Sequence, residues 1–457
     1  MRLLQKTGLV GIGVIAGIAL SLHFAAKAER ESLPTPLPIE ELRAFSEVFG
    51  RIKSDYVEPV SDQKLINEAI NGMLSGLDPH SAYLDADAFK ELQVGTQGEF
   101  GGLGIEVGME DGLVKVVSPI EDTPAYHAGI KSGDLIIKLD DTLVKGMTLN
   151  DAVKRMRGKP GSKIVLTVVR KDQPKPLIIT LVRAVIKVQS VKSKMAEPGY
   201  GFVRITQFQE HTGENLATAL SNLAKQNGGP LKGLVLDLRN DPGGLLTGAV
   251  AVSAAFLNPD ALVVYTEGRT EDAQMRLTAS PQNYLRAGGT DYLASLPASI
   301  KATPLVVLVN GGSASASEIV AGALQDHKRA VIMGTQTFGK GSVQTVLPLG
   351  NNTAIKLTTA RYYTPGGRSI QAKGIVPDIV VEDANSDNIL RLREADLDRH
   401  LSNDLPDEKT PPTPATPSDT GKNNGKAPAP AEFGSANDYQ LNQALNLLKG
   451  MRILQGK

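Results

Sequence analysis

The 457-residue sequence contains no cysteine and no tryptophan, and aromatic residues make up only 4% of it. The absence of cysteine excludes disulfides, thiolate metal sites and a cysteine nucleophile, but it leaves the redox compartment open. The sequence also has no excess of positive or negative charge, because 49 Lys and Arg balance 49 Asp and Glu. A basic footprint is what a nucleic-acid-binding protein would show, so we expect no nucleic-acid partner.

Glycine and proline are plentiful, with 46 and 27 residues, which predicts many turns and short strands. Hydrophobic residues make up 41% and charged residues 21%, values typical of a globular protein. The length is too great for one compact core and suits roughly two or three domains. The sequence therefore predicts a folded multidomain protein.

Residues 1–28 have the pattern of an export signal. Arg2 and Lys6 precede an uncharged apolar stretch, and small residues at Ala26 and Ala28 offer a cleavage site. About 20 apolar residues can cross a bilayer, so retention as a membrane anchor is equally open. In both cases the cations place the N-terminus in the cytoplasm and the body outside it. We expect export to a bacterial periplasm, either soluble or anchored to the inner membrane by this segment alone.

Helical patterns flank the body of the chain. Residues 29–94 contain apolar residues at helical spacing and predict an N-terminal helical module. Residues 396–438 hold seven prolines and predict a disordered linker, whereas residues 439–455 predict an amphipathic C-terminal helix. These helices carry no chemistry, and we expect a packing role or a homodimer formed through the N- and C-terminal helices.

Residues 95–183 change to short strands and glycine turns. A glycine-rich turn leads into a strand at Ile105, an Ala-Gly-x-x-x-Gly-Asp turn ends at Asp134, and a helix with a capping box opens at Thr148. In this order the features resemble a PDZ domain, a β-rich unit with two helices. The resemblance implies that the segment binds the C-terminal tails of protein substrates. Converging N–H groups of the glycine turn would hold the terminal carboxylate while the tail adds a strand to the sheet edge. The peptide-binding residues expected are Gly101, Gly102, Leu103, Gly104, Ile105, Leu149 and Val153.

Residues 184–395 contain two strand–glycine turn–helix units, at 233–256 and 304–326, which predict an α/β layer structure with functional groups at the carboxyl ends of strands. In the second turn Ser315 and Glu318 fit a capping box, so Ser315 lies at a helix N-terminus. Free N–H groups there can stabilise an oxyanion. The pattern by itself also fits a simple helix cap.

A nucleophilic serine needs a base. None of the six histidines lies in a catalytic-looking turn, although spacing leaves His80, His127 and His211 open. Lys340, flanked by glycines, is the other candidate, and it can act as a base if desolvation lowers its pKa from about 10.4 to near 7. The same stretch nearly matches a phosphate-binding loop, but Gly341 replaces the metal-binding hydroxyl and a strand follows, so we set nucleotide binding aside.

Taken together, the segments resemble the carboxyl-terminal processing peptidases, also called tail-specific proteases, a family of exported serine peptidases. The match spans about Ile39 to Asp378, and its most specific motifs lie at 312–319, 337–344 and 360–370. The resemblance implies an α/β multidomain protein in which a crotonase-like ββα protease core carries an inserted PDZ domain and an N-terminal helical module. It implies no metal, nucleotide or other cofactor.

The same resemblance assigns roles within the site. Ser315 is the nucleophile, Lys340 the general base and Gln344 the residue that orients the lysine. A straight strand would separate positions 340 and 344 by about 13 Å, so the chain must bend near Gly341 if the two side chains are to meet. The oxyanion hole would be formed by the N–H group of Ala316 and that of one glycine, either Gly243 or Gly244.

Three hypotheses follow. The first is a serine endopeptidase that cleaves exported proteins near their C-termini through an acyl-enzyme, with the PDZ domain holding the tail. The second is a non-catalytic periplasmic PDZ scaffold that binds tails without cutting them. The third is a serine–histidine hydrolase that depends on His80, His127 or His211. The first is favoured because a scaffold has no use for a glycine-flanked lysine beside a capped serine.

Overall fold

The computed structural model describes residues 37–120, 122–171, 173–187, 189–382, 393–405 and 434–454. The predicted export segment and most of the predicted linker lie outside these residues. The chain divides into two compact units, Met1–Ile70 and Asn71–Lys457, and each is described by itself. Across the described ranges, no helix has both the length and the apolar character needed to span a membrane.

The first unit contains α2 (Ile39–Asp55) and most of α3 (Asp62–Ser75). Glu40 and Glu41 lie in the first turn of α2, where negative charge complements the helix dipole. None of the side chains of α2 is buried. Its apolar residues at helical spacing therefore remain exposed, and they include Ile39, Leu42, Phe45, Val48 and Ile52.

The segment that resembles a PDZ domain is a β-rich unit. Its antiparallel sheet has the order β3-β4-β5-β7-β8, with β6 on β5, and a separate ribbon pairs β2 with β9. The strands are β2 (Glu99–Gly102), β3 (Ile105–Glu110), β4 (Leu113–Pro119), β5 (Leu135–Leu139), β6 (Thr142–Leu143), β7 (Lys163–Val169), β8 (Leu177–Val182) and β9 (Ala184–Lys187). The two helices are α5 (Pro124–His127) and α6 (Leu149–Met156). The capping box predicted at Thr148 forms, because its hydroxyl accepts the Asp151 N–H at 3.1 Å.

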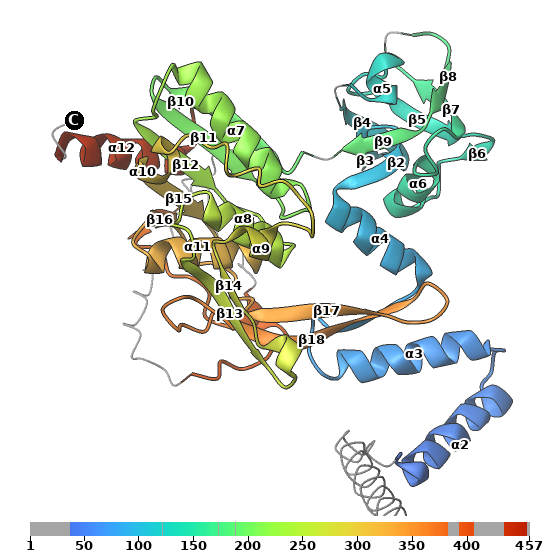
Figure 1. Ribbon diagram of the computed structural model, residues 1–457. Helices are drawn as coiled ribbons and strands as arrows, with labels where there is room; N and C mark the ends of the chain where they lie inside the picture. The colour runs from blue at the N-terminus through green and yellow to red at the C-terminus, as the bar shows by residue number, and fades with distance from the viewer. Residues whose placement is uncertain are drawn as a thin grey trace, which may run out of the picture. The chain divides into compact units, whose positions relative to one another are not determined.

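A six-stranded sheet with the order β10-β11-β12-β15-β16-β19 forms the centre of the larger α/β domain (Figure 1). All neighbouring pairs are parallel except β10 with β11. The strands are β10 (Val191–Glu197), β11 (Tyr200–Ile205), β12 (Gly233–Asp237), β15 (Leu305–Val309), β16 (Val331–Gly334) and β19 (Ile379–Val380). Every residue of β12 and β15 is buried, as expected for parallel strands covered on both faces.

Helices cover both faces of this sheet. One apolar cluster joins it to α7 (Thr212–Asn227), α8 (Leu246–Ala254) and α11 (Ala316–Asp326). A second cluster joins the other face to α12 (Tyr439–Leu454), the predicted C-terminal helix, through Leu441, Ala444, Leu445 and Leu448. Just before α12, the buried Asp438 accepts hydrogen bonds from the fully buried Arg239 at 2.9 and 2.6 Å. This ion pair fixes the start of α12 beside the end of β12.

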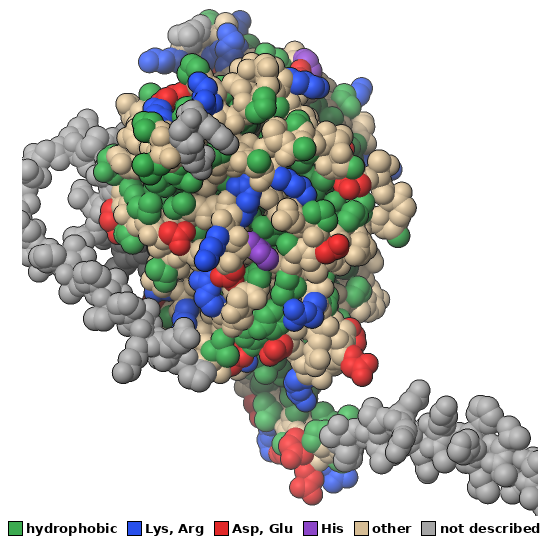
Figure 2. Space-filling model, turned by 60° about the vertical axis from the view of Figure 1, so that its left-hand side comes forward, with side chains coloured by type: hydrophobic (Ala, Val, Ile, Leu, Met, Phe, Trp, Pro, Cys, Tyr) green, Lys and Arg blue, Asp and Glu red, His purple; other side chains and the backbone are tan. Residues whose placement is uncertain are grey.

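A second sheet has the order β1-β18-β13-β14, with β17 paired to β18. Its strands are β1 (Ala82–Leu84), β13 (Leu262–Gly268), β14 (Arg276–Thr278), β17 (Ser342–Pro348) and β18 (Ala354–Tyr363). The remaining helices are α4 (Ala86–Gln97), α9 (Pro281–Tyr284), α10 (Ser299–Ala302) and the 3₁₀ turns η1 (Glu271–Ala273) and η2 (Glu394–Asp396). On the face shown in Figure 2, acidic, basic and apolar side chains are interspersed, in keeping with the balanced charge.

Candidate active site

Ser315 occupies a strained turn between β15 and α11. It is the N-cap residue of α11 and has φ 56° and ψ −113°. A non-glycine residue in such a conformation costs about 1–3 kcal/mol, and strain of this kind is concentrated at functional sites. A strained serine between a buried strand and a helix is the arrangement by which α/β hydrolases expose a nucleophile.

Hydrogen bonding separates Ser315 from the serines on either side of it. The Ser313 hydroxyl donates to the Leu238 carbonyl at 2.7 Å, and the Ser317 hydroxyl donates to the Asp241 carbonyl at 2.9 Å. Both of these side chains are fully buried, whereas Ser315 is partly exposed and its hydroxyl makes no capping hydrogen bond. Composition alone could not distinguish the three, but only Ser315 donates to no backbone carbonyl that the structure describes, and its hydroxyl interacts with that of the buried Tyr362.

The fully buried Glu318 joins the Ser315 turn to the loop that carries Lys340. Its carboxylate accepts four hydrogen bonds, from the N–H groups of Ser315 (2.8 Å), Lys340 (2.9 Å) and Gly339 (2.8 Å) and from the Thr337 hydroxyl (2.5 Å). Burial raises the pKa of Glu318 to about 7, although the four donors act in the opposite direction. The sequence identified Glu318 only as a capping partner and gave no sign of its contacts with residues 337–340.

Lys340 and Ser315 line one cavity of about 700 Å³. Burial is the main cause that lowers the pKa of Lys340, and the positive charge of Lys356 adds to it. The carboxylates of Glu394, Glu318 and Asp78 act in the opposite direction. A lowered pKa is what a lysine base requires. Within the described part of the chain, no hydrogen bond yet joins Lys340 Nζ to Ser315 Oγ.

Gln344 lines the same cavity but contacts other partners in this conformation. Its amide donates to Ser342 Oγ at 3.0 Å and to Thr358 Oγ1 at 3.2 Å, and it makes no hydrogen bond with Lys340 among the residues described. The strand register shifts between Val343 and Gln344. The extra residue of this β-bulge is Thr359 of β18, so the bend that the sequence required near Gly341 stays a prediction. Gly341 itself is needed for close packing, because a Cβ there would lie 2.3 Å from the Gln371 nitrogen.

The two candidate oxyanion glycines differ in their hydrogen bonds. Gly243 has φ +94°, and a Cβ there would lie 2.8 Å from the Ala316 nitrogen. Its N–H donates to Asp241 Oδ1 at 2.9 Å. The N–H groups of Gly244 and Ala316 have no hydrogen-bond partner in the part of the chain that the structure describes. Both glycines and Ala316 line the cavity.

Asp241 ties this glycine loop to the Ser315 turn. Its backbone carbonyl accepts hydrogen bonds from the Ala314 N–H at 3.0 Å and from the Ser317 hydroxyl. This carbonyl therefore holds in place the residues on both sides of Ser315. The side chain is fully buried, and burial raises its pKa to about 7. The sequence gave no reason to single out this residue.

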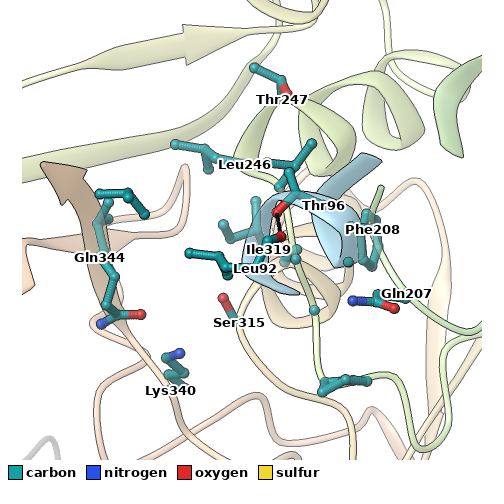
Figure 3. Close-up of a pocket in the computed structure, with 18 of the residues that line it drawn as sticks. Leu92, Thr96, Gln207, Phe208, Leu246, Thr247, Ser315, Ile319, Lys340 and Gln344 are labelled. Atoms are coloured by element: carbon teal, nitrogen blue, oxygen red, sulfur yellow. Dashed lines mark hydrogen bonds between the residues drawn. The ribbon is translucent and has the colours of Figure 1, made fainter. Parts of the chain in front are cut away.

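The rest of the cavity is largely apolar. Figure 3 shows the Ser315 hydroxyl facing a space bordered by Leu92 of α4, Gln344 and Lys340. The buried Tyr362 also lines it, and the Tyr362 hydroxyl donates to the Lys340 carbonyl. Burial holds the pKa of Tyr362 well above its usual range. Further apolar lining comes from Phe208, Leu245, Leu246, Ile319, Val343 and Val346.

None of the three histidines left open by the sequence lines this cavity. His127 is exposed, and His211 lies on the surface with Nδ1 3.3 Å from Glu214. His80 Nε2 lies 2.8 Å from a carboxylate oxygen of Glu394. The geometry therefore gives no support to a serine–histidine pair. Over the described ranges, no cluster of His, Asp and Glu is arranged to hold a metal ion.

The structure gives the predicted peptide-binding residues distinct positions. Gly101 and Gly102 belong to β2, which pairs with β9, and a Cβ at Gly101 would lie 2.0 Å from the Gly158 carbonyl oxygen. Gly101 is thus required for close packing, a role that the sequence did not suggest. Leu103 and Gly104, with φ +77° at Gly104, connect β2 to β3, which starts at Ile105. Leu149 and Val153 lie on α6 and pack against the core of the same unit.

Comparison with known proteins assigns the chain to a family. Residues 199–381 match peptidase family S41, residues 101–181 match the PDZ domain, and residues 20–88 match the activating protease CtpB N-terminal domain. The carboxy-terminal-processing protease of Bartonella bacilliformis is 46% identical over 442 residues, which cover 95% of each chain. The carboxy-terminal processing protease CtpB of Bacillus subtilis is 35% identical over 395 residues, which cover 84% of this chain and 78% of that protein. A solved structure, the photosystem II D1 C-terminal processing protease, is 32% identical with a TM-score of 0.42 and covers 74% of this chain and 86% of its own. The chain belongs to the carboxy-terminal processing proteases, serine peptidases of family S41 that carry a PDZ domain.

Proposed function

We propose that the protein is an endopeptidase that cuts exported proteins near their C-termini, with Ser315 as nucleophile and Lys340 as general base. The observation that carries this proposal is their shared cavity. A strained serine lines it together with a lysine of lowered pKa. The tail-binding scaffold is not favoured, because it would need neither feature.

The reaction follows from these positions. The neutral Lys340 amine accepts the Ser315 proton while Oγ bonds to the carbonyl carbon of the scissile peptide. The N–H groups of Ala316 and Gly244 stabilise the resulting oxyanion, since the N–H of Gly243 already donates to Asp241. The lysine then passes its proton to the departing amine. Water then bonds to the acyl carbon and loses a proton to the same lysine, which returns this proton to Ser315 Oγ as the ester bond breaks.

Gln344 orients Lys340 in the reacting conformation. To do so it must exchange its hydrogen bonds with Ser342 and Thr358 for one with the lysine. Catalytic hydrogen bonds commonly tighten only when substrate is bound. The crotonase-like ββα arrangement inferred from the family resemblance remains our proposal for the protease core.

The PDZ domain presents the substrate. The terminal carboxylate of a substrate binds at the turn of Leu103 and Gly104, and the preceding residues add to the sheet edge beside Leu149 and Val153. This role is supported by the match of residues 101–181 to the PDZ family. We further propose that residues 1–28 direct export to a bacterial periplasm and that the exposed apolar residues of α2 take part in a homodimer.

The test uses Ser315→Ala and Lys340→Ala in the purified protein with an unfolded substrate that has an apolar tail. Each substitution should reduce hydrolysis by about 10³-fold or more while thermal unfolding stays unchanged or improves. The matched controls, Ser295→Ala and Lys301→Ala, replace exposed residues of the same types and should retain full activity. A sulfonyl fluoride adduct mapped by mass spectrometry should fall on Ser315. Full activity in either site variant contradicts the mechanism, and binding without cleavage by the unaltered protein supports the scaffold.

A further inference from the structure

A turn far from Ser315 in the sequence reaches the loop that carries Lys340. This turn, residues 78–81, connects α3 to β1. The buried Asp78 fixes its shape by accepting the N–H groups of His80 at 2.8 Å and Ser81 at 2.9 Å. The His80 side chain, which is 16% exposed, is thereby directed to a buried partner on η2.

That partner is Glu394, which is fully buried. His80 Nε2 lies 2.8 and 3.0 Å from its two carboxylate oxygens. Because both oxygens are acceptors, Nε2 is the donor, and the hydrogen bond is assisted by charge. The interaction with His80 and a hydrogen bond from Gln371 lower the pKa of Glu394 against the effect of burial, so the carboxylate stays ionised.

Glu394 is hydrogen-bonded to both ends of the loop that carries Lys340, directly at one end and through Gln371 at the other. Its backbone N–H donates to the Phe338 carbonyl at 3.1 Å. Its Oε1 accepts the amide of Gln371 at 2.9 Å, and Gln371 Oε1 in turn accepts the Gly341 N–H at 2.9 Å. Gln371 is fully buried, so this bridge is shielded from water. The Glu394 backbone therefore holds the loop at Phe338, and its carboxylate, which His80 contacts, holds the loop at Gly341 through Gln371.

The charge of the same carboxylate also raises the pKa of Lys340. The acids that favour a protonated lysine are Glu394, with the largest effect, then Glu318 of α11 and Asp78 of the turn. Lys356 of β18 opposes them, and the neutral Tyr362 contacts the lysine carbonyl. A base must be unprotonated to accept a proton, so an unbalanced charge on Glu394 would work against catalysis.

We propose that His80 is a positioning residue for Lys340: its Nε2 donor holds Glu394 in the bridge through Gln371 to Gly341 and engages the carboxylate whose charge acts on the lysine amine. This rests on the proposed role of Lys340 as the base. His80 does not line the catalytic cavity and takes no part in proton transfer with Ser315.

The two partners should shift the pH dependence in opposite directions. His80→Gln replaces the ring N–H that both Glu394 oxygens accept with a weaker amide donor, so more of the carboxylate charge acts on Lys340 and the lysine stays protonated to higher pH. The acidic limb of kcat/KM should then move up by about one pH unit, with roughly a tenfold loss at neutral pH that is recovered at alkaline pH. Glu394→Gln removes the charge, so the limb should move to lower pH. The double variant should follow Glu394→Gln, because the carboxylate charge is then absent whichever donor occupies position 80.

Two further measurements keep the proposal open to refutation. The control, His211→Gln, exchanges the same residue types at an exposed position and should leave the profile unchanged. In a Ser315→Ala background, labelling of Lys340 by acetic anhydride at a series of pH values, mapped by mass spectrometry, reads the amine without relying on activity. The same opposite shifts should appear there, and Glu394→Gln alone still tests the proposal if His80→Gln does not fold.

Shifts in the same direction, or a loss of kcat without any shift, would show that His80 is merely structural and would overturn the proposal. Full activity of Lys340→Ala would instead overturn the proposed function. The two failures are therefore distinguishable, because the first leaves the need for Lys340 intact.

Discussion

At the scale of single residues, burial in the site disfavours the charged forms that lysine and carboxyl side chains usually have at neutral pH. Burial lowers the pKa of Lys340 and raises the pKa of Glu318 and Asp241 to about 7. Ser315 adds backbone strain. Each departure costs folding free energy, so these residues are retained for chemistry and for loop placement rather than for stability.

Replacing Lys340 should therefore stabilise the protein. Because its folded pKa is lowered, the unfolded chain binds more protons between that value and 10.5, and the wild-type protein gains stability as the pH rises through this window. Lys340→Met should raise the free energy of unfolding at neutral pH by about 1 kcal/mol while abolishing activity. Urea unfolding at several pH values measures this, and the advantage should vanish as the pH approaches 10.5. An equal advantage at all pH values would contradict it.

Replacing Glu318 should have the opposite effect on stability. Gln has one acceptor oxygen where Glu318 uses two, so Glu318→Gln leaves buried N–H or O–H donors without acceptors. We expect a loss of about 2–4 kcal/mol in the free energy of unfolding and at least a roughly hundredfold loss of activity. Chemical unfolding and peptide hydrolysis measure the two, and Glu271→Gln on the surface is the control. Retention of both properties would show that the four hydrogen bonds are dispensable.

Sequence alone suggests the proposed nucleophile and base, but not the residues that pack around them. Ser315 and Lys340 stand in glycine-marked turns whose chemistry can be inferred from residue type. The choice between Gly243 and Gly244 depends on where one N–H points, which Asp241 decides through a contact that spacing does not reveal. Tyr362 and Glu394 contact the Lys340 loop only through tertiary packing, so no local sequence pattern predicts these contacts.

At the scale of elements, the buried strands and the helices behind them follow from the sequence because their apolar runs and turn residues are local. The predicted helix at 245–256 is α8 (Leu246–Ala254), and the predicted strand at 343–347 is β17 (Ser342–Pro348). The bulge at Thr359 of β18 was not predicted, because it arises from pairing with β17, a contact between separate segments. The same holds for the face of the sheet on which α12 docks.

The docking of α12 depends on the ion pair between Arg239 and Asp438. Both side chains are nearly inaccessible, at 1% and 4%, so removing the Asp438 charge leaves Arg239 buried with Asp237 as its remaining carboxylate partner. Asp438→Asn should lower the free energy of unfolding by about 3 kcal/mol, whereas Asp141→Asn at an exposed position should have little effect. Urea unfolding measures this. Equal stability of the two variants would show that the apolar contacts of α12 suffice.

At the scale of the whole molecule, a PDZ domain and a protease domain in one chain predict that the substrate terminus and the scissile bond are recognised separately. A substrate whose C-terminal carboxylate is amidated should bind the PDZ domain more weakly, because charge-assisted hydrogen bonds worth about 1.5–3 kcal/mol are lost. We expect KM to rise by roughly tenfold or more with a smaller change in kcat. Steady-state kinetics on paired substrates with free and amidated ends measure it. Equal KM values would contradict recognition of the carboxylate.

Glu318 and Asp241 together have a consequence for solution behaviour. Both carboxyls take up protons near neutrality in the folded protein, whereas the same groups in the unfolded chain do so only at markedly lower pH. Between those ranges the native state holds more protons, so mild acidification should raise the melting temperature. A protonated carboxyl is a poorer acceptor, however, so the hydrogen bonds that hold the N–H groups of Ser315, Lys340 and Gly243 would weaken. Acid should thus make this protease harder to unfold and, at the same time, less able to cut.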